Sequence, residues 1–294
     1  MVYFLQLLLT GFVTGAVYSL VALGFVIIYK CSSVLNFAQG QMLMVGAFAT
    51  WAFLAILKLP IGIGILLGLI VAAIMGWLIN RLTIRPLIGQ PLLAIMMMTL
   101  GLGILLDAVT VTIFGGLERA YPEFIPITAV NIGPLVVSQQ RLCCCGVALL
   151  LFGLFTFLFH RTRIGLSMRA VAEGHDVARS LGIRVGNVFT HAWVIAAISA
   201  TVGGILLGSI NGVSMGLSTI GLKIFPVVLV GGLQSIPGCI VAGPLIGVLE
   251  TLAAGYLDPF TQGGMSDVMP FLVMIAILFI KPYGFFGEVR IERI

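Results

Sequence analysis

Long runs of apolar residues follow one another along this chain, with only short polar stretches between them. A helix needs about 20 mostly apolar residues to cross the hydrocarbon core of a bilayer. The runs cover nine ranges: 3–29, 34–57, 61–79, 92–114, 142–159, 188–211, 218–235, 237–257 and 266–280. Because they are continuous rather than alternating, they predict membrane-spanning helices and argue against a β-barrel.

The composition excludes a soluble protein. Of the 294 residues, 60% are hydrophobic and only 9% are charged, whereas soluble domains carry about 25% charged residues. A soluble enzyme, a disordered chain and a coiled coil are therefore excluded. We expect an all-α polytopic membrane protein with about 8–10 transmembrane helices in a single domain over 1–294. The range allows for the short run 266–280 and the interrupted runs 34–57 and 218–235.

Basic residues indicate the orientation, because Lys and Arg collect in cytoplasmic loops. Nine spans alternating from an outside N-terminus place four of the 15 basic residues outside: Lys58, Arg119, Arg141 and Lys223. The other eleven are then cytoplasmic: Lys30, Arg81, Arg85, Arg161, Arg163, Arg169, Arg179, Arg184, Lys281, Arg290 and Arg293. The N-terminus is therefore predicted outside and the C-terminus inside, with 115–141, including Pro126, as a periplasmic loop. The net charge of +5 reflects this topology and does not indicate nucleic acid.

The cytoplasmic segment 160–187 has helical patterning that a solvated loop would not need. Between Met168 and Leu181, apolar residues can share one helix face, and Gly182 is a natural stop. We predict a helix that docks on a cytoplasmic partner. The alternative is that arginines of this segment bind anionic lipid headgroups: Arg161, Arg163, Arg169 and Arg179.

Two interrupted segments align when the chain is shifted by 185 residues, so that Asn36 faces Gly221 and Gly46 faces Gly231. An odd number of spans separates them, as an inverted repeat requires. Paired broken helices in the two halves are typical of a translocation path. The candidate path residues are Asn36, Gln39, Gly40 and Gln41 in the first segment, and Gly221, Lys223 and Pro226 in the second. The alternatives are an interfacial helix start in the first segment and a tight turn after the second.

Ionisable residues inside predicted spans are costly and therefore informative. Asp107 and Glu250 are predicted to line a polar cavity, or to pair with Lys223 or a hydroxyl, unless they lie at a water-exposed interface. His191 has no neighbours of a metal or catalytic type and is interpreted as structural. A glycine face in the sixth run, which includes Gly204 and Gly208, predicts close helix packing.

The sequence lacks the motifs that would indicate an enzyme. It has no GxxxxGK[ST] phosphate loop and no HExxH. The five cysteines, three of them consecutive, show no metal-ligand spacing and are interpreted as small apolar helix residues. We therefore expect no catalytic residue, no metal and no cofactor bound by this chain.

Four stretches carry a resemblance to a known family. They are LNFAQGQ at 35–41, RAVAE and LGI at 169–183, GLK, VGG and SIPG at 221–238, and KPYGFFG at 281–287. Their order and spacing resemble the LivH-type integral-membrane permease of bacterial branched-chain amino-acid ABC importers. Many members have His and Glu where this chain has Gln39 and Gln41. This departure is compatible with a different substrate.

The resemblance implies a permease domain over 1–294 in the bacterial inner membrane. It implies a homologous second permease subunit, two cytoplasmic ATP-binding subunits that hold ATP-Mg, and a periplasmic substrate-binding protein. The family's coupling region maps onto Ala170, Val171, Glu173, Gly174, Ala178, Leu181 and Gly182. The cargo would be leucine, isoleucine, valine or a related amino acid.

Three other functions have less support in the sequence. A channel or facilitator for a small neutral solute, such as urea or an amide, would use the same broken helices but would not need a patterned docking helix. An ion-coupled secondary transporter would need more ionisable groups at mid-membrane than this chain has. A membrane-embedded enzyme has no constellation of residues in its favour.

Overall fold

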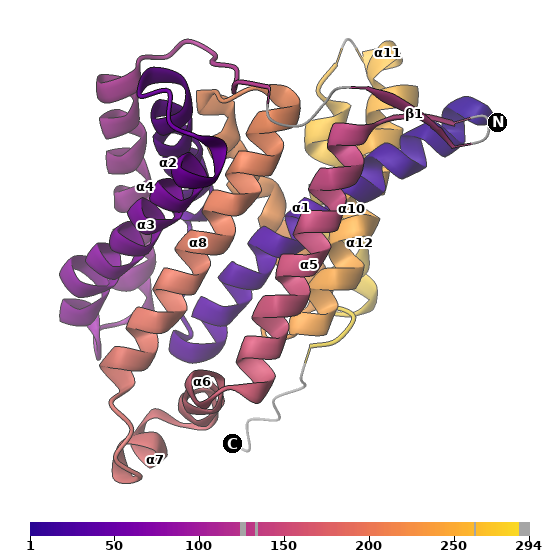
Figure 1. The fold of residues 1–294 in the computed structure, drawn as a ribbon. Helices are drawn as coiled ribbons and strands as arrows, with labels where there is room; N and C mark the ends of the chain where they lie inside the picture. Colours follow the sequence, from indigo (N-terminus) through magenta and orange to yellow (C-terminus); the bar gives the residue numbers. More distant parts are fainter. Residues whose placement is uncertain (124–127, 133–134, 262, 288–294) are drawn as a thin grey trace. The chain divides into compact units, whose positions relative to one another are not determined.

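The computed structural model describes residues 1–123, 128–132, 135–261 and 263–287, and these are almost entirely helical (Figure 1). The longer helices are α1 (Val2–Ser32), α2 (Gln39–Trp51), α3 (Ile61–Ile79), α4 (Leu92–Phe114), α5 (Gln139–Arg161), α8 (Val185–Asn211), α9 (Ile220–Gly231), α10 (Ile236–Tyr256) and α12 (Met265–Ile280). The shorter helices are α6 (Arg163–Glu173), α7 (His175–Ser180) and α11 (Asp258–Thr261). Each of the nine predicted runs overlaps one of the longer helices.

Within the described residues, seven helices are long and apolar enough to cross a membrane. Two of them are extended by π-helical turns, Ala52–Ile56 after α2 and Asn80–Ile84 after α3. Two further apolar helices are shorter, Met215–Gly231 and Met265–Ile280. The prediction of an all-α polytopic membrane protein is confirmed.

Prolines and glycines set several helix boundaries. Pro60 and Pro91 precede α3 and α4 in extended conformation, where a residue without a backbone N–H loses no helical hydrogen bond. Gly115 and Gly212 follow α4 and α8 with φ of 77° and 85°, a conformation that favours glycine. These positions explain why the apolar runs end where they do.

One small sheet was not predicted. Strands β1 (Ala129–Ile132) and β2 (Leu135–Ser138) pair antiparallel, with Ala129 opposite Ser138. They lie in the segment 115–141 that was interpreted as a loop, and four-residue strands are too short for alternation to reveal. Pro126, Arg290 and Arg293, used in the topology argument, lie outside the described residues.

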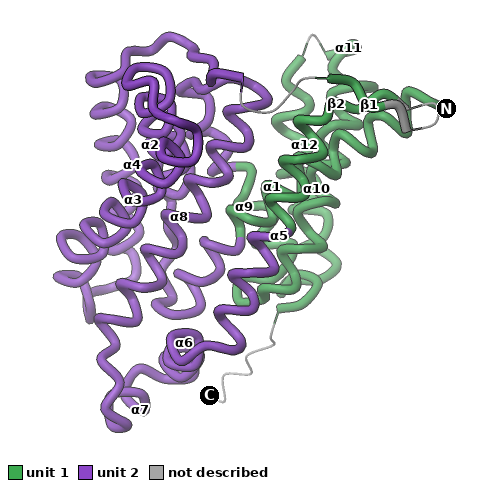
Figure 2. The backbone as a smooth tube through the Cα atoms, viewed as in Figure 1, with its two compact units in different colours: residues 1–22, 126–149, 223–294 green, residues 23–125, 150–222 purple. Residues whose placement is uncertain are grey.

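The chain divides into two compact units, each built from separated stretches of sequence (Figure 2). Unit 1 comprises 1–22, 126–149 and 223–294, and unit 2 comprises 23–125 and 150–222. In unit 1, α1 and α10 approach so closely that a Cβ on Gly15 would lie 2.4 Å from the Gly243 carbonyl oxygen. Small residues allow this backbone approach in a membrane, where the hydrophobic effect does not drive association.

In unit 2, α8 packs against both α2 and α3. A Cβ on Gly204 would lie 2.3 Å from the Leu43 carbonyl oxygen, and one on Gly76 would lie 2.6 Å from that of Trp193. Trp193 is fully buried in this core. The structure thus confirms close packing at the predicted glycine face of α8.

Candidate functional site

The first interrupted segment is a buried turn that two amide side chains hold together. Asn36 Oδ1 accepts a hydrogen bond from the Ala38 N–H at 3.2 Å, and Asn36 Nδ2 donates to Gln39 Oε1 at 2.9 Å. Gln39 Nε2 in turn donates to the Ala196 carbonyl at 3.3 Å. Both amides are 1% exposed. A buried amide needs such partners, so this turn is a specified structure rather than a frayed helix start.

The two predicted interruptions meet in unit 2. A Cβ on Gly40 would lie 2.1 Å from the Ser218 carbonyl oxygen and 2.7 Å from Gly221 Cα. A Cβ on Gly221 would lie 2.5 Å from Gly40 Cα. The first turn of α2 and the first turn of α9 therefore cross backbone against backbone. The sequence aligned these segments as equivalents, and the structure brings them into contact.

The break in the second segment lies earlier than predicted. Gly212 ends α8, and a 3-10 helix at Met215–Thr219 leads into α9. Pro226 does not break the chain but is buried inside α9. Prolines are tolerated in membrane helices when surrounding protein groups satisfy the freed carbonyl. Pro226, a predicted path residue, thus continues the helix, and the irregular backbone lies at Gly212 and in the 3-10 helix.

Gln41 lies beside Asp107 of α4. Gln41 Nε2 donates to Asp107 Oδ2 at 3.3 Å. Gln41 Oε1 and Asp107 Oδ1 are both buried and have no hydrogen-bond partner among the described residues. Two acceptor oxygens without donors are unusual in a protein interior. Asp107 was predicted to act inside the membrane. Its hydrogen-bond partner in the structure is the amide of Gln41 and not a basic residue.

Lys223 is the centre of an ion cluster in unit 1. Its Nζ lies 2.5 Å from Glu250 Oε1 and 2.7 Å from Asp267 Oδ1. The side chains of Lys223 and Glu250 are 16% and 12% exposed, whereas that of Asp267 is 71% exposed. The pairing of Glu250 with Lys223 was predicted. Asp267 was missed because it stands at the start of the short run 266–280, where an acidic residue is typical of a helix N-terminus.

The predicted docking segment is two helices joined at Gly174. The side chain of Thr162 caps α6 by accepting from the Gly165 N–H at 3.1 Å. The His175 ring nitrogen Nε2 hydrogen-bonds the Cys31 carbonyl at 3.0 Å. After α7 the chain turns at Gly182, with φ of 82°, as predicted. A single helix from Met168 to Leu181 was expected, but the break at Gly174 lets the chain change direction there.

The apolar face of this segment is divided between the chain's own core and its surface. Met168, Val171 and Ala178 are at most 1% exposed, so they anchor the two helices on unit 2. Val177 and Leu181 are 66% and 72% exposed. Large apolar side chains that remain uncovered next to a buried anchor are typical of a contact surface.

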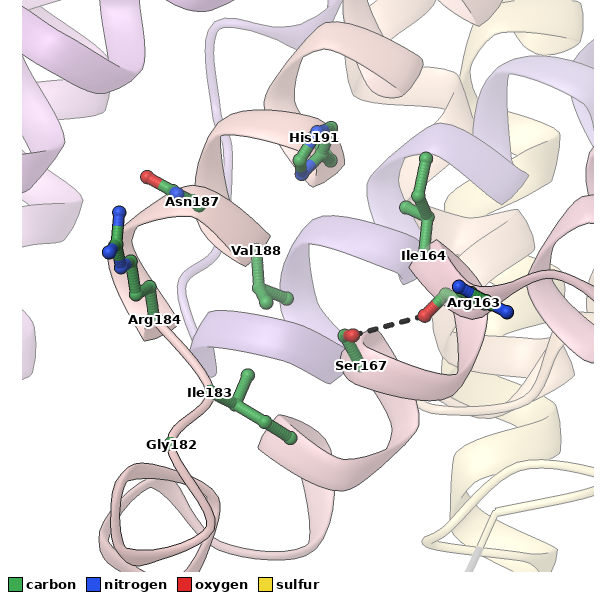
Figure 3. Close-up of a pocket in the computed structure, with 9 residues that line it drawn as sticks. All are labelled: Arg163, Ile164, Ser167, Gly182, Ile183, Arg184, Asn187, Val188 and His191. Carbon is green, nitrogen blue, oxygen red and sulfur yellow. Dashed lines mark hydrogen bonds between the residues drawn. The ribbon is translucent and has the colours of Figure 1, made fainter.

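A cavity of 430 Å³ opens beside α6 and the start of α8 (Figure 3). Its lining comes from three places, α6, the turn after α7 and α8: Arg163, Ile164, Ser167, Gly182, Ile183, Arg184, Asn187, Val188 and His191. Ser167 Oγ donates to the Arg163 carbonyl at 3.0 Å. His191, interpreted as structural from the sequence, is an exposed residue on this wall.

The segment that follows α4 is fastened onto unit 2 by contacts that sequence reasoning missed. Arg119 and Val213 form an antiparallel bridge. Trp51 Nε1 donates to the Ala120 carbonyl at 3.0 Å, and the Tyr121 hydroxyl donates to the Ala47 carbonyl at 2.8 Å. Burial raises the pKa of Tyr121 well above its usual value, which keeps the hydroxyl protonated as a donor. The sequence signal that could have indicated these contacts is the presence of the aromatic and basic residues Trp51, Arg119 and Tyr121 near the ends of predicted spans.

No group of three or more His, Cys, Asp or Glu side chains that could hold a metal ion occurs in the part of the chain that the structure describes. The polar residues instead form hydrogen-bonded pairs and one ion cluster.

Comparison with known proteins decides the family. The family described as "Branched-chain amino acid transport system / permease component" matches residues 7–278. The chain belongs to this permease family. It is 29% identical over 308 residues to the high-affinity branched-chain amino acid transport system permease protein LivH of Salmonella typhimurium, covering 99% of this chain and 98% of that protein.

Another relative of this permease is the corresponding protein BraD of Pseudomonas aeruginosa, at 31% identity over 309 residues, with 99% and 98% of the two chains covered. A solved structure, PsaBC from Streptococcus pneumoniae in complex with Fab, is 16% identical with a TM-score of 0.48, covering 95% of this chain and 90% of that one. The family match and the seven candidate spans make the permease a multi-pass membrane protein and a transport subunit.

Proposed function

We propose that this permease is the membrane subunit of an ABC importer that carries branched-chain or related amino acids across a bacterial inner membrane. The observation that carries the proposal is the family match over 7–278. The names of the relatives, LivH and BraD, describe high-affinity branched-chain amino acid transport. The four sequence stretches that resemble the permeases of ABC importers extend this to ATP-driven transport.

The proposed topology has the N-terminus outside and the C-terminus in the cytoplasm. The excess of basic residues in the loops assigned to the cytoplasm supports it. Residues 1–294 would act as one permease domain, with an inverted repeat that relates the segments around Asn36 and Gly221. The contact between Gly40 and Gly221 supports the repeat, because inverted repeats place their broken helices next to each other.

The solute path would pass the interrupted segments, each of which carries buried or half-buried polar groups. In the first segment Asn36 and Gln39 shape the turn, Gly40 permits the helix crossing, and Gln41 with Asp107 offers free acceptor oxygens. An amino acid carries an ammonium group, for which such oxygens are suitable partners. Lys223, held by Glu250, and Pro226 would belong to the second segment.

Coupling to ATP hydrolysis would use α6, α7 and the turn at Gly182. Met168, Val171 and Ala178 would hold the segment on the permease core, with the half-buried Ala170 beside them, and Glu173 and Gly174 would form its corner. Val177 and Leu181 would make the contact with an ATP-binding subunit, because they are exposed and apolar. A segment anchored at several buried residues can transmit a push as a rigid lever.

The proposed partners are a homologous second permease subunit, two cytoplasmic ATP-binding subunits and a periplasmic substrate-binding protein. ATP and Mg²⁺ would bind only to the ATP-binding subunits. The basis in this chain is the absence from its sequence of a GxxxxGK[ST] phosphate loop. Affinity for the cargo would then reside in the binding protein, and the permease would need only a weak site.

The test is co-purification of the ATP-binding subunits with variants of the full chain. Leu181→Arg and Leu117→Arg are a matched pair, because the two side chains are 72% and 70% exposed. Leu181 lies in the proposed contact, and Leu117 lies in the loop after α4, on the opposite side in the proposed topology. We expect Leu181→Arg to lose at least about nine-tenths of the bound ATP-binding subunit, the scale of a lost contact residue, and Leu117→Arg to lose none.

The proposal fails if wild-type permease, expressed with the genes for candidate partners, purifies alone. The coupling assignment fails if both substitutions weaken the complex equally, because a general loss of folding would then explain the result. Size-exclusion profiles of both variants in detergent separate these cases.

A further inference from the structure

A second cavity lies at the other side of the start of α8, and none of the assignments above uses it. It has a volume of 310 Å³ and is lined by Trp77, Arg81, Arg85, Asn187, Thr190 and His191. Asn80 Nδ2 donates to Thr190 Oγ1 at 2.8 Å, and Arg85 Nη2 donates to Asn187 Oδ1 at 3.2 Å. These bonds join the end of α3 to the first turns of α8, so the cavity has fixed walls.

The cavity carries positive charge that no nearby acidic group balances. None of its six described lining residues is acidic, and neither Arg81 nor Arg85 forms a salt bridge within the described part of the chain. The Arg81 guanidinium lies 5.1 Å from the centre of the Trp77 ring, a cation–π contact that orients the side chain. Two oriented guanidinium groups around a cavity are suited to a phosphate.

Two of the four arginines considered from the sequence as lipid ligands are already engaged within the chain. Arg169 donates to the Phe159 carbonyl and lies over the Phe159 ring, and Arg179 is paired with Asp176 at 3.8 Å. Their cationic groups already have partners within the chain. Arg81 and Arg85 keep donors directed at an open cavity.

An apolar stripe on α3 leads to this cavity. Ile63, Leu66, Ile70 and Ile74 are between 45% and 58% exposed, and their spacing of three or four residues places them on one helix face. The stripe continues in the same register to Trp77. Arg81 stands 20 residues after Ile61, about 30 Å along a helix, which equals the thickness of the hydrocarbon core. The cavity therefore lies at headgroup level when the stripe faces acyl chains.

We propose that this cavity binds the phosphate headgroup of an anionic phospholipid, whose acyl chains lie along the α3 stripe. The stripe favours a lipid over a free anion, because inorganic phosphate has no acyl chain that could contact the apolar side chains of α3. Trp77 at the junction matches the preference of tryptophan for the membrane interface. The inference does not depend on the cargo, on the ATP-binding subunits or on the orientation of the chain.

The test uses Trp77 as the reporter in the assembled, full-length transporter. Nanodiscs contain phosphatidylcholine with 20% phosphatidylglycerol, and either lipid is brominated on its acyl chains so that it quenches a tryptophan in contact with it. The Trp77 signal is the difference between each protein and its own Trp77→Phe version, which removes the contributions of Trp51, Trp193 and the partners. We expect brominated phosphatidylglycerol to quench Trp77 more strongly, mole for mole, than brominated phosphatidylcholine.

Three variants give the proposal its controls. Arg81→Gln with Arg85→Gln should reduce the preference for phosphatidylglycerol at least about five-fold, the effect of one cation near an anionic lipid. Arg81→Lys with Arg85→Lys should retain most of it, which excludes misfolding as the cause. Arg161→Gln with Lys281→Gln removes the same charge at two exposed positions elsewhere and should leave the preference unchanged.

Several results would overturn the proposal. Equal quenching by the two lipids would show that the headgroup is not recognised, and an equal loss in the Arg161 and Lys281 variant would reduce the effect to bulk charge. If 10 mM inorganic phosphate abolished the preference, the site would bind a free anion and not a lipid. If no brominated lipid quenched Trp77 in the assembled transporter, protein would cover this face.

Discussion

The two interrupted segments are stabilised by opposite kinds of polar chemistry. Asn36 and Gln39 are neutral, 1% exposed, and pair with each other and with backbone groups. Lys223 is charged and is paired with two carboxylates, one of which, on Asp267, is 71% exposed. Neutral amides can be fully buried once their hydrogen bonds are made, whereas ions need partners and some access to water. The first segment is therefore expected to be rigid and the second to respond to charge changes.

The largest expected effect comes from the helix crossing on which the first segment depends. Gly40→Ala should destabilise the permease by about 3 kcal/mol or more, because the added Cβ would meet the Ser218 carbonyl oxygen at 2.1 Å and backbone cannot move aside easily. Gly101→Ala is the control, since nothing lies within 4 Å of its Cβ position. Thermal unfolding in detergent measures both. Similar melting temperatures would show that the crossing is not tight.

The ion cluster should show the next largest effect. Lys223→Met leaves Glu250 without its cation and should cost about 2–3 kcal/mol, somewhat below the range for a fully buried pair. The triple change Lys223→Met, Glu250→Gln and Asp267→Asn removes all the charges together and should recover most of this loss. Chemical unfolding of the three proteins in detergent tests the claim. No recovery in the triple variant would mean that the residues act through packing rather than charge.

The amide turn should cost less to disrupt than the ion cluster. Asn36→Ala removes a partner from Gln39 and from the Ala38 N–H, and is expected to cost about 1–2 kcal/mol. A double-mutant cycle with Gln39→Ala should give a coupling energy of about 1 kcal/mol. Gln90→Ala is the surface control, since this side chain is exposed, and should change stability by less than about 0.5 kcal/mol. Additive effects of the two amide substitutions would contradict the paired turn.

Asp107 should show the smallest effect. Asp107→Asn turns one acceptor into a donor and can supply the hydrogen bond that Gln41 Oε1 lacks. We expect stability to stay equal or to rise by up to about 1 kcal/mol, while transport falls if the free oxygens serve the cargo. Melting temperature and uptake, measured on the same preparation, separate the two roles. A large loss of stability would show that the carboxylate has another partner.

The sequence predicted the parts of this fold that depend on composition and periodicity. The apolar runs, the interruption at Asn36 and the stop at Gly182 follow from local physical rules, whereas the pairing of Lys223 with Glu250 was one of several alternatives that the sequence left open. The contact of Gly40 with Gly221 joins residues far apart in the chain, so local rules could not predict it. The sequence only aligned the two segments as members of a repeat.

Other features could not be predicted because they depend on tertiary packing. The apolar residues Met168, Val171, Ala178 and Leu181 share one helical pattern, yet only Leu181 is exposed. Periodicity identifies an apolar face but not what covers it. The break at Gly174 and the continuation of α9 through Pro226 likewise depend on neighbouring helices. The cavity at Arg81 and Arg85 forms only where the end of α3 approaches the start of α8, so the sequence alone could not reveal it.

The most direct test of the account is uptake of labelled leucine by proteoliposomes that contain the complete transporter, with ATP inside and the binding protein outside. We predict accumulation above the outside concentration that requires both ATP and the binding protein, and that is lost in the Leu181→Arg variant but not in Leu117→Arg. Downhill flux of leucine or a small amide through the permease, without ATP and unchanged by Leu181→Arg, would contradict the account and indicate a channel.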